Sequence, residues 1–372
     1  MTAPVVLAAG GTGGHMFPAE ALARVLADRG CPVVHMTDSR GKAFSASVPE
    51  VQVERLFIPF PKGGFPAKLK AAAGMAVAFC QARRRLARLR PCVVVGFGGY
   101  PSVPAVLAAW TLRIPVVLHE QNAVLGRANR LLARRARLLA AAFNSVERVP
   151  PGLRMECVGN PVRPAIAALA GRHYEPPRPD GPFHVFITGG SQGAAVFGMV
   201  IPAAAGLLPE DQRRRLRVVH QVRPEQLEDV RRAWQDMGVE AEVSAFFTDM
   251  PERLAWSHLM ISRSGASTLA ELAMAGRPAV LVPYPAAADD HQSVNARIIT
   301  GNGAGWLMPQ PEFTPGTLSV LLADLMSPEG AGYLEQAARA MKSHARPDAA
   351  EKLADAVLSP GRKQEAGVSD RT

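Results

Sequence analysis

The chain has 372 residues, enough for two domains of ordinary size, each with its own core. Hydrophobic residues make up 48% of it and charged residues 20%, which excludes an intrinsically disordered chain. The N-terminus carries no cationic stretch ahead of an apolar core, and no apolar run approaches the roughly 20 residues of a membrane-spanning helix. Four scattered cysteines form no C-x-x-C pair and predict reduced core residues. We therefore expect a cytosolic chain without a signal peptide.

Short apolar runs alternate with helical patterns along almost the whole chain. Apolar runs that lie between helices are typical of parallel strands buried on both faces. We expect an α/β fold with two doubly wound, Rossmann-like domains facing one another across a cleft. The predicted strands are residues 5–9, 33–36, 51–58, 92–96, 116–118, 138–143 and 155–158 in the first half, and 183–188, 216–220, 241–246, 259–262, 279–282 and 305–308 in the second.

The domain boundary is predicted within the stretch NPVRPAI, residues 160–166, where two prolines bracket Arg163. A helical pattern runs from residue 333 to residue 358 and is expected to pack across the hinge. The predicted parts are an acceptor and membrane-facing domain at 1–162, a nucleotide-binding domain at 163–340, a helix across the hinge at 341–358 and a disordered polar tail at 359–372.

Two glycine-rich loops follow the first strand of each half. The loop GGTGGH, residues 10–15, follows the strand at 5–9, and the loop GGSQG, residues 189–193, follows the strand at 183–188. Glycine lets the backbone approach an anionic ligand closely, and the next helix points its free N–H groups and positive dipole end at that charge. The sequence therefore predicts two anion sites.

A dinucleotide-binding enzyme is one alternative for these loops. The nicotinamide and flavin fingerprint needs G-x-G-x-x-G, but Met16 stands where the third glycine belongs, and Ser191 interrupts the second loop. Asp38, near the end of the second predicted strand, imitates a ribose-binding acid. The simplest alternative is that the glycines only make tight turns. Polar residues that such turns do not need weaken this alternative, namely Thr12 and His15 in the first loop and Ser191 and Gln192 in the second.

Polar residues gather where other strands are expected to end. In open α/β folds ligands bind beyond the carboxyl ends of the strands. Glu271, inside the first turns of a helix, can accept two hydrogen bonds from ribose hydroxyls. The first half places at the same rim Tyr100, His119, Glu120, Gln121 and Asn122.

The net charge of +10 belongs to the first half, because residues 1–162 carry +13 and the remainder −3. Much of it lies in residues 61–90, where basic side chains flank apolar ones. This pattern favours an anionic bilayer surface over nucleic acid, since no interleaved aromatic residues are available to stack on bases. A helix with a solvated basic face is the alternative. The residues proposed for membrane contact are Phe65, Lys68, Leu69, Lys70, Met75, Phe79, Arg83, Arg84 and Arg85.

Seven motifs occur in one order along the chain: GGTGGH, GFGGY, HEQN, GNPVR, GGSQG, RSGA-S-T-x-x-E and HQ-x-x-NA. With these motifs the chain resembles the MurG family of bacterial peptidoglycan glycosyltransferases from residue 5 to residue 358. The resemblance implies the GT-B architecture and transfer of N-acetylglucosamine from UDP-GlcNAc to the 4-hydroxyl of the muramoyl sugar of lipid I. The product would be lipid II, formed with inversion at the cytoplasmic face of the bacterial inner membrane.

Inversion requires one in-line displacement, hence a base for the acceptor hydroxyl and stabilisation of the departing UDP. His15 is the predicted base, with His119 and Glu120 as orienting groups or substitutes; a histidine that only caps the loop is the alternative. By resemblance, the acceptor diphosphate is bound by Gly13, Gly14, Gly98, Gly99 and Tyr100. The donor is predicted to contact Thr12, Gly13, Gly14, Asn122, Arg163, Ser191, Gln192, Phe247, Ala266, Ser267, Thr268, Leu269, Glu271, Gln292 and Asn295.

No cofactor and no metal are expected in this scheme. Metal-dependent transferases use an Asp-x-Asp pair, whereas Asp289 and Asp290 are adjacent, and Arg163 with helix dipoles is able to take the role of a cation. The predicted partners are UDP-GlcNAc, lipid I and an anionic membrane surface, with no nucleic acid. Another GT-B transferase and a non-catalytic nucleotide-sugar-binding protein remain as alternatives.

Overall fold

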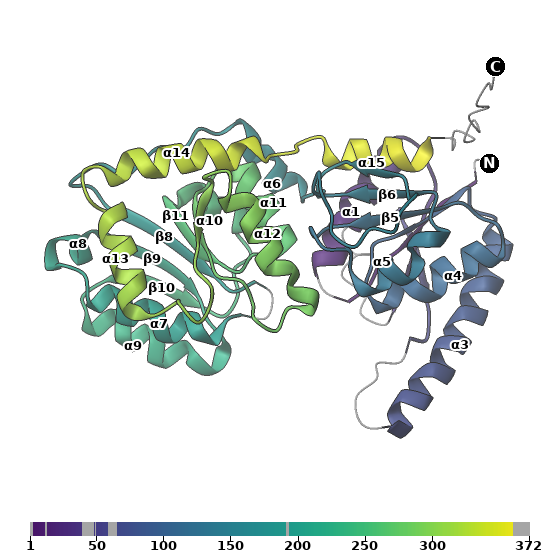
Figure 1. Ribbon diagram of the computed structural model, residues 1–372, viewed down its shortest axis with the longest axis horizontal. Coiled ribbons are helices and arrows are strands. Elements are labelled where there is room, and N and C mark those ends of the chain that lie inside the picture. The colour runs from purple at the N-terminus through teal and green to yellow at the C-terminus, as the bar shows by residue number, and fades with distance from the viewer. Residues whose placement is uncertain are drawn as a thin grey trace, which may run out of the picture.

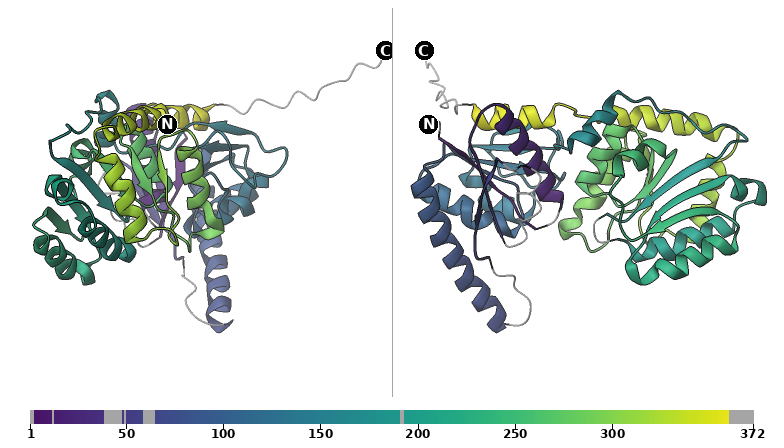
Figure 2. Two further views of the ribbon diagram at one scale, coloured as in Figure 1. Left: turned by 60° about the vertical axis from the view of Figure 1, so that its left-hand side comes forward. Right: turned by 180° about the vertical axis from the view of Figure 1, so that it is seen from behind.

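The computed structural model describes residues 3–11, 13–38, 48, 50–58, 65–190 and 193–359, with the backbone alone for 65–71. These residues form two lobes joined along one edge (Figure 1), and Figure 2 shows the same division from two further directions. Each lobe is built around one parallel sheet. We call the lobe of the N-terminal sheet the first domain and the other the second domain.

The first domain contains, within the described residues, a parallel sheet of seven strands in the order β3-β2-β1-β4-β5-β6-β7. Runs such as VVLA and VVVG are buried along their whole length because helices cover both faces. The strands are β1 (Val5–Ala8), β2 (Val33–Thr37), β3 (Gln52–Arg55), β4 (Val93–Gly96), β5 (Val116–Glu120), β6 (Leu138–Ala141) and β7 (Met155–Cys157).

Helices of the first domain cover both faces of this sheet. One face packs against α1 (Gly13–Asp28) and the C-terminal helix, and the other against α3 (Phe65–Leu89) and α4 (Val103–Thr111). The short helix α5 (Arg127–Leu132) follows β5. The N-terminal end of α3 projects away from the sheet in all views (Figures 1 and 2).

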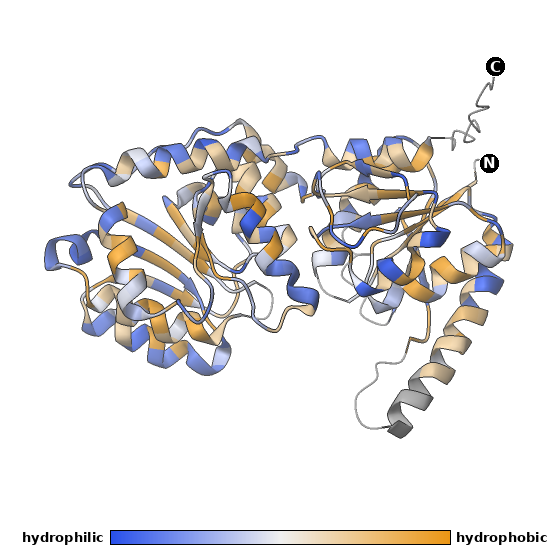
Figure 3. Ribbon diagram, viewed as in Figure 1, coloured by the Kyte–Doolittle hydropathy of each residue, from blue (hydrophilic) through white to orange (hydrophobic). Residues whose placement is uncertain are grey.

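The second domain repeats this plan with six described strands in the order β10-β9-β8-β11-β12-β13, all parallel. Figure 3 shows apolar segments in strands of both sheets. The strands are β8 (Phe183–Thr188), β9 (Leu216–Gln221), β10 (Glu240–Ser244), β11 (Leu259–Ser262), β12 (Ala279–Leu281) and β13 (Gly305–Leu307).

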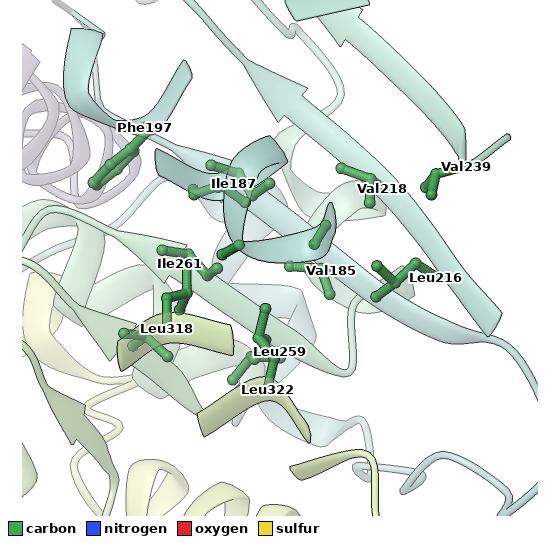
Figure 4. Close-up of a cluster of buried hydrophobic side chains, with 14 of the residues drawn as sticks. Val185, Ile187, Phe197, Leu216, Val218, Val239, Leu259, Ile261, Leu318 and Leu322 are labelled. Atoms are coloured by element: carbon green, nitrogen blue, oxygen red, sulfur yellow. The ribbon is translucent and has the colours of Figure 1, made fainter. Parts of the chain in front are cut away.

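One face of the second sheet carries the core seen in Figure 4, where Leu259 and Ile261 of β11 lie against Leu318 and Leu322. Burying each such side chain contributes about 1.5–3 kcal/mol. The second-domain helices are α6 (Pro164–Ala167), α7 (Ala195–Gly206), α8 (Glu210–Arg215), α9 (Leu227–Asp236), α10 (Met250–Trp256), α11 (Ala266–Ala275), α12 (His291–Thr300), α13 (Pro315–Leu325) and α14 (Gly330–Ser343).

The predicted helical stretch 333–358 is divided into α14 and α15 (Ala349–Leu358). The break precedes and includes Pro347, which has no N–H to donate and disfavours helical geometry at the residue before it. Helix α14 packs on the second domain, whereas α15 places Leu353 and Val357 in the core of the first domain. Arg29, which directly follows α1, also pairs with Asp355 at 2.7 Å. The chain therefore crosses between the domains a second time.

Every predicted strand is present, so the prediction of two doubly wound parallel sheets is confirmed. The strand predicted at 241–246 ends at Ser244, whose hydroxyl donates to the carbonyl of Phe246 and turns the backbone out of the sheet. The expectation of core cysteines is wrong, because Cys80 and Cys92 are exposed and Cys31 and Cys157 are half-buried.

Candidate active site

A cleft of about 1010 Å³ lies between the two domains, at the carboxyl ends of both sheets. Its walls come from the loops after β1, β4 and β5 in the first domain and after β8 and β11 in the second. This is the position where open α/β sheets bind ligands. The volume matches the upper end of the range for small-molecule sites, as a large ligand requires.

His15 lies in the first turn of α1 and lines the cleft. Its Nδ1 is 3.3 Å from Oε1 of Gln121, which follows β5. Burial lowers the pKa of His15, and the nearby charge of Glu120 only partly opposes this effect. The ring is therefore neutral near pH 7, which is the state that accepts a proton.

Gly99 leaves room beside this ring, and the neighbouring Gly98 leaves room beside Asn129. Gly98 and Gly99 have φ of +82° and +70°, a backbone region that other residues rarely adopt. A methyl group on Gly99 would lie 3.2 Å from Nε2 of His15. Gly98, Gly99 and Tyr100 line the cleft, as do Gly13 and Gly14. The GFGGY loop therefore presents backbone, without side-chain bulk, to the Nε2 edge of the histidine.

His119 was expected at the rim of the cleft, but it is fully buried on β5 and does not line the cleft. Its Nε2 lies 3.2 Å from the carbonyl oxygen of Gly159, and its Nδ1 lies 3.0 Å from Nε2 of Gln121. Burial lowers the pKa of His119 to about 4. This side chain is placed to orient others and not to contact a ligand.

Glu120 lines the cleft, yet its carboxylate is occupied by the protein. Oε1 accepts from the backbone and side chain of Asn122 at 3.0 and 3.2 Å, and Oε2 accepts from Gly126 N and Asn129 Nδ2, both at 2.9 Å. Four donors leave this carboxylate little capacity to replace His15 as a base. Its contacts instead shape the loop at 122–126.

That loop is attached to the second domain through Asn295 of α12. Asn295 is fully buried, accepts from Ala123 N at 2.8 Å and donates to Asn122 Oδ1 at 3.1 Å. Asn295 was expected to touch the sugar, but it lies behind the cleft surface and joins the domains. Gln292, one turn earlier, does line the cleft, and its Oε1 accepts from Tyr284 N.

Arg163 and Glu271 line the second-domain side of the cleft and form an ion pair at 3.1 Å. Arg163 also lies over the ring of Phe17, 4.9 Å from its centroid. Burial raises the pKa of Glu271, while the charge of Arg163 opposes the shift. The predicted diphosphate-binding and ribose-binding groups are therefore neighbours.

Thr188, the last residue of β8, precedes the second glycine loop, and its hydroxyl accepts from Gly190 N at 3.1 Å and donates to Gln221. Gly189, Gly190 and Gly193 line the cleft. Three predicted ligand-binding residues lie outside the described residues, namely Thr12, Ser191 and Gln192.

The start of α11 provides the nucleotide wall. Ala266, Ser267 and Thr268 line the cleft, whereas Leu269 is buried in the core behind it. Phe247 lines the cleft with a mostly buried ring that packs edge-on against Phe186, at 6.0 Å between centroids. The ring of its exposed neighbour Phe246 also lines the cleft.

Asp289 bridges the mouth of the cleft to the first domain. Its carboxylate is 2.7 Å from Arg148, 2.8 Å from Arg130 and 3.3 Å from Arg127. The hydrogen bond from Arg148 is the main cause that lowers the pKa of Asp289. Groups of three or more His, Cys, Asp or Glu side chains that are able to hold a metal ion do not occur in the part of the chain that is described.

Models of the N-terminal and C-terminal domains of glycosyltransferase family 28 match residues 5–140 and 184–353. The UDP-N-acetylglucosamine–N-acetylmuramyl-(pentapeptide) pyrophosphoryl-undecaprenol N-acetylglucosamine transferase of Rhodospirillum centenum is 54% identical over 96% of this chain and 94% of its own length. The enzyme of the same name from Rhodospirillum rubrum is 50% identical over 95% and 91%. The crystal structure of Acinetobacter baumannii MurG covers 95% of this chain and 99% of its own, with 32% identity and a TM-score of 0.75.

The chain belongs to the MurG family of glycosyltransferases. The GT-B architecture expected from the motifs is thereby confirmed. A UDP-GlcNAc 2-epimerase from Neisseria meningitidis has a similar structure, with a TM-score of 0.66 over 96% of this chain and 100% of its own, but is only 15% identical. That likeness concerns the fold alone.

In this member of the MurG family, the basic segment is largely the helix α3. Met75 and Phe79 pack partly against the first-domain core, and Arg85 pairs with Glu54 at 3.2 Å. Arg83 and Arg84 are exposed. The side chains of four other predicted contacts lie outside the description: Phe65, Lys68, Leu69 and Lys70. None of the described helices is long and apolar enough to span a bilayer.

Several residues that line the cleft were missed in the sequence. Gln221 and Arg223 follow the predicted strand 216–220 and obey the rule that polar residues after a strand reach the ligand edge. Arg263 was not predicted to line the cleft because it stands in a motif of small residues. In the structure it lines the cleft and donates to the carbonyls of Val282 and Pro283. Tyr284 carried no signal beyond being aromatic.

Proposed function

We propose that this chain transfers N-acetylglucosamine from UDP-GlcNAc to the 4-hydroxyl of the muramoyl sugar of lipid I, forming lipid II with inversion. The observation that carries the proposal is one cleft that joins a neutral His15 on the first domain to the Arg163–Glu271 pair on the second. The names of relatives that match nearly the whole chain specify the same two substrates.

In the proposed reaction, Nε2 of His15 accepts the proton of the acceptor 4-hydroxyl. The hydroxyl oxygen forms a bond to the anomeric carbon while the bond from that carbon to the UDP oxygen breaks, and UDP leaves with the electron pair. Arg163 and the N–H groups at the start of α7 stabilise the charge on the departing diphosphate. The sequence of steps needs no cofactor or metal ion.

For the donor, we assign Glu271 to the ribose hydroxyls, because a carboxylate accepts from two hydroxyls at once. The start of α11 and Phe247 enclose the base, and Gln292 and Asn122 face the sugar from opposite domains. Loops 13–14 and 98–100 are assigned to the acceptor diphosphate, since the N-terminus of α1 favours an anion there.

The test is turnover of UDP-GlcNAc with a lipid I analogue, followed as UDP release and as formation of the disaccharide product. We expect both products in equal amounts and only when the acceptor is present. Formation of a disaccharide with another acceptor, but none with the lipid I analogue, would favour a different GT-B transferase. UDP binding without any turnover would favour a non-catalytic nucleotide-sugar-binding protein.

We also propose that the chain works at the cytoplasmic face of the bacterial inner membrane, bound peripherally through α3. The support is the charge of +13 on residues 1–162, with Arg83 and Arg84 exposed on α3 and Val77 of the same helix 48% exposed. Near an anionic surface each such cation contributes about 1 kcal/mol before screening. Nucleic acid is not a proposed partner.

Co-sedimentation with anionic vesicles tests this surface. Replacing Arg83 and Arg84 by Glu is expected to reduce binding severalfold, whereas Arg85 is left intact because it pairs within the domain. The matched control replaces Arg172 and Arg232, two exposed second-domain arginines, by Glu, with the same change in charge. Equal losses in both variants would indicate a general charge effect and contradict a specific role for α3.

A further inference from the structure

We infer that Gln121 is a positioning residue that, together with His119, fixes the proton of His15 on Nδ1 and leaves Nε2 as the basic nitrogen. This inference rests on the proposed function, in which His15 removes the acceptor proton. It assigns a role to Gln121, which lines the cleft beside His15 on the loop after β5. We call these three side chains the His15–Gln121–His119 network.

The network is anchored at both ends by backbone carbonyls, which only accept hydrogen bonds. The carbonyl oxygen of Gly159 lies 3.2 Å from Nε2 of His119, so this nitrogen carries the proton. The carbonyl oxygen of Phe97 lies 3.1 Å from Nε2 of Gln121, so the amide must present its NH₂ group on that side. With the proton of His119 on Nδ1, or with the oxygen and nitrogen of the Gln121 amide exchanged, two hydrogen-bond acceptors would face each other.

The remaining contacts then have one solution. Nδ1 of His119 carries no proton and accepts from Nε2 of Gln121 at 3.0 Å, so the two amide hydrogens serve His119 and Phe97. Oε1 of Gln121 consequently faces Nδ1 of His15 at 3.3 Å, and only a protonated Nδ1 makes a hydrogen bond there. A neutral imidazole has one proton, so its Nε2 holds a lone pair.

The free nitrogen is directed toward the place where an acceptor is needed. The Nε2 edge of His15 faces Gly99, in the loop proposed to hold the acceptor diphosphate. With the opposite tautomer, Nε2 would present a proton to the acceptor hydroxyl and be unable to accept one. In serine proteases, loss of the group that sets the tautomer of the catalytic histidine lowers kcat by about 10⁴.

An amide at position 121 accepts a hydrogen bond from His15 without placing a negative charge beside the ring. A carboxylate would also accept from Nδ1, but its charge would raise the pKa of the histidine and protonate more of it at neutral pH. The titratable groups that act on His15 from neighbouring elements are Glu120 and His119 on β5 and His291 on α12. Gln121 orients the ring without adding to the charge of Glu120.

The experiment compares Gln121→Met and Gln121→Glu in the full chain, using UDP-GlcNAc and a soluble lipid I analogue. Methionine keeps the length of the side chain but offers Nδ1 no comparable acceptor, and we expect kcat to fall between about 10-fold and 10³-fold with little change in the donor KM. Glutamate supplies a charged acceptor, and we expect the acid limb of the kcat profile to move to higher pH, with much of the rate recovered in alkali.

The tautomer is read directly from the ring ¹⁵N resonances of ¹⁵N-histidine-labelled protein, with His15→Ala to assign His15. We expect the Nδ1–H form in the parent chain and its loss in Gln121→Met. Gln221→Met, at the end of β9 in the other domain, is the matched control and should leave the His15 resonances unchanged.

An unchanged His15 tautomer in Gln121→Met overturns this inference, as does a Gln121→Glu profile with an unmoved acid limb. If Gln121→Met fails to fold, the ring resonances and the profile of Gln121→Glu still decide the matter. Failure of the parent chain to glycosylate the lipid I analogue overturns the proposed function instead. The two failures are therefore distinguished by different measurements.

Discussion

The two walls of the cleft are built on equivalent strands but carry different chemistry. β1 lies between β2 and β4, as β8 lies between β9 and β11, and each is followed by a glycine-rich loop. At the first wall, His15 and Gln121 line the cleft and His119 lies behind them, and these three neutral side chains are linked by hydrogen bonds. At the second wall stands the charged pair Arg163 and Glu271. The same sheet edge therefore supports proton transfer or charge recognition, depending on the side chains placed at and behind it.

Replacing His15 by Ala should break the first wall and give the largest effect. We expect kcat to fall about 10²- to 10⁴-fold, as for loss of a general base, while UDP-GlcNAc binds nearly as before. Steady-state kinetics and donor titration measure the two quantities separately. A kcat close to that of the parent would contradict the assignment of proton transfer to the first wall.

Replacing Glu271 by Ala tests the second wall. A charged hydrogen-bonding group contributes about 1.5–3 kcal/mol, so we expect kcat/KM for UDP-GlcNAc to fall roughly 10- to 150-fold, chiefly through KM. Glu271→Gln keeps the volume and should fall between the parent and Ala. A folded Glu271→Ala protein with an unchanged donor KM would contradict the assignment to ribose.

Both domains contain buried histidines, which should make the stability of the fold depend on pH: His35 and His119 in the first domain and His220 in the second. Burial lowers the pKa of His35 and His119 to about 4 and that of His220 to about 3, below the unfolded value of 6.5. Below pH 6.5 the folded state thus binds fewer protons than the unfolded state. The stabilisation that comes from keeping these histidines neutral is therefore complete above pH 6.5 and is lost as the pH falls toward 4. Each histidine contributes up to about 1.4 kcal/mol per pH unit in that window.

His220→Asn sharpens this test because the amide is able to accept from Trp234 Nε1 as His220 Nδ1 does, but does not titrate. We expect the thermal midpoint of the variant to decline less between pH 6.5 and 4.5 than that of the parent. Parallel declines would mean that other groups dominate the acid transition.

Asp289 joins the walls, and its loss should give the smallest effect. Arg127 and Arg148 are exposed, whereas Asp289 and Arg130 are half-buried, and ion pairs near the surface contribute little in water. We expect Asp289→Asn to raise the donor KM a few-fold and to increase the radius of gyration measured by X-ray scattering. Asp290→Asn, in the same loop but bonded to Ser293, is the control. Identical behaviour of the two variants would contradict the bridging role.

Strands and the ligand edge could be predicted from the sequence, because apolar runs between helices and glycines after strands are local signals. The direction of His119 was not predictable in this way. All five residues of β5 are buried, so no alternation of polar and apolar positions marks which side chains face the cleft. The first-domain partners of Asp289 and Asn295 lie more than 140 residues away, and nothing local identifies them.

Helix α15, which is synthesised last, completes the core of the first domain, which is synthesised first. Leu353, Ala354, Ala356 and Val357 complete a core whose other side chains come largely from residues 5–158. The two crossings also meet, since a methyl group on Gly159 would lie 2.7 Å from Cβ of Arg346 and 3.0 Å from Cβ of Ala349. On the ribosome, the domain made first therefore lacks these four side chains until the last helix is made, whereas the second domain is complete through α14. A fragment ending near residue 162 would leave the part of its core that α15 covers exposed to water.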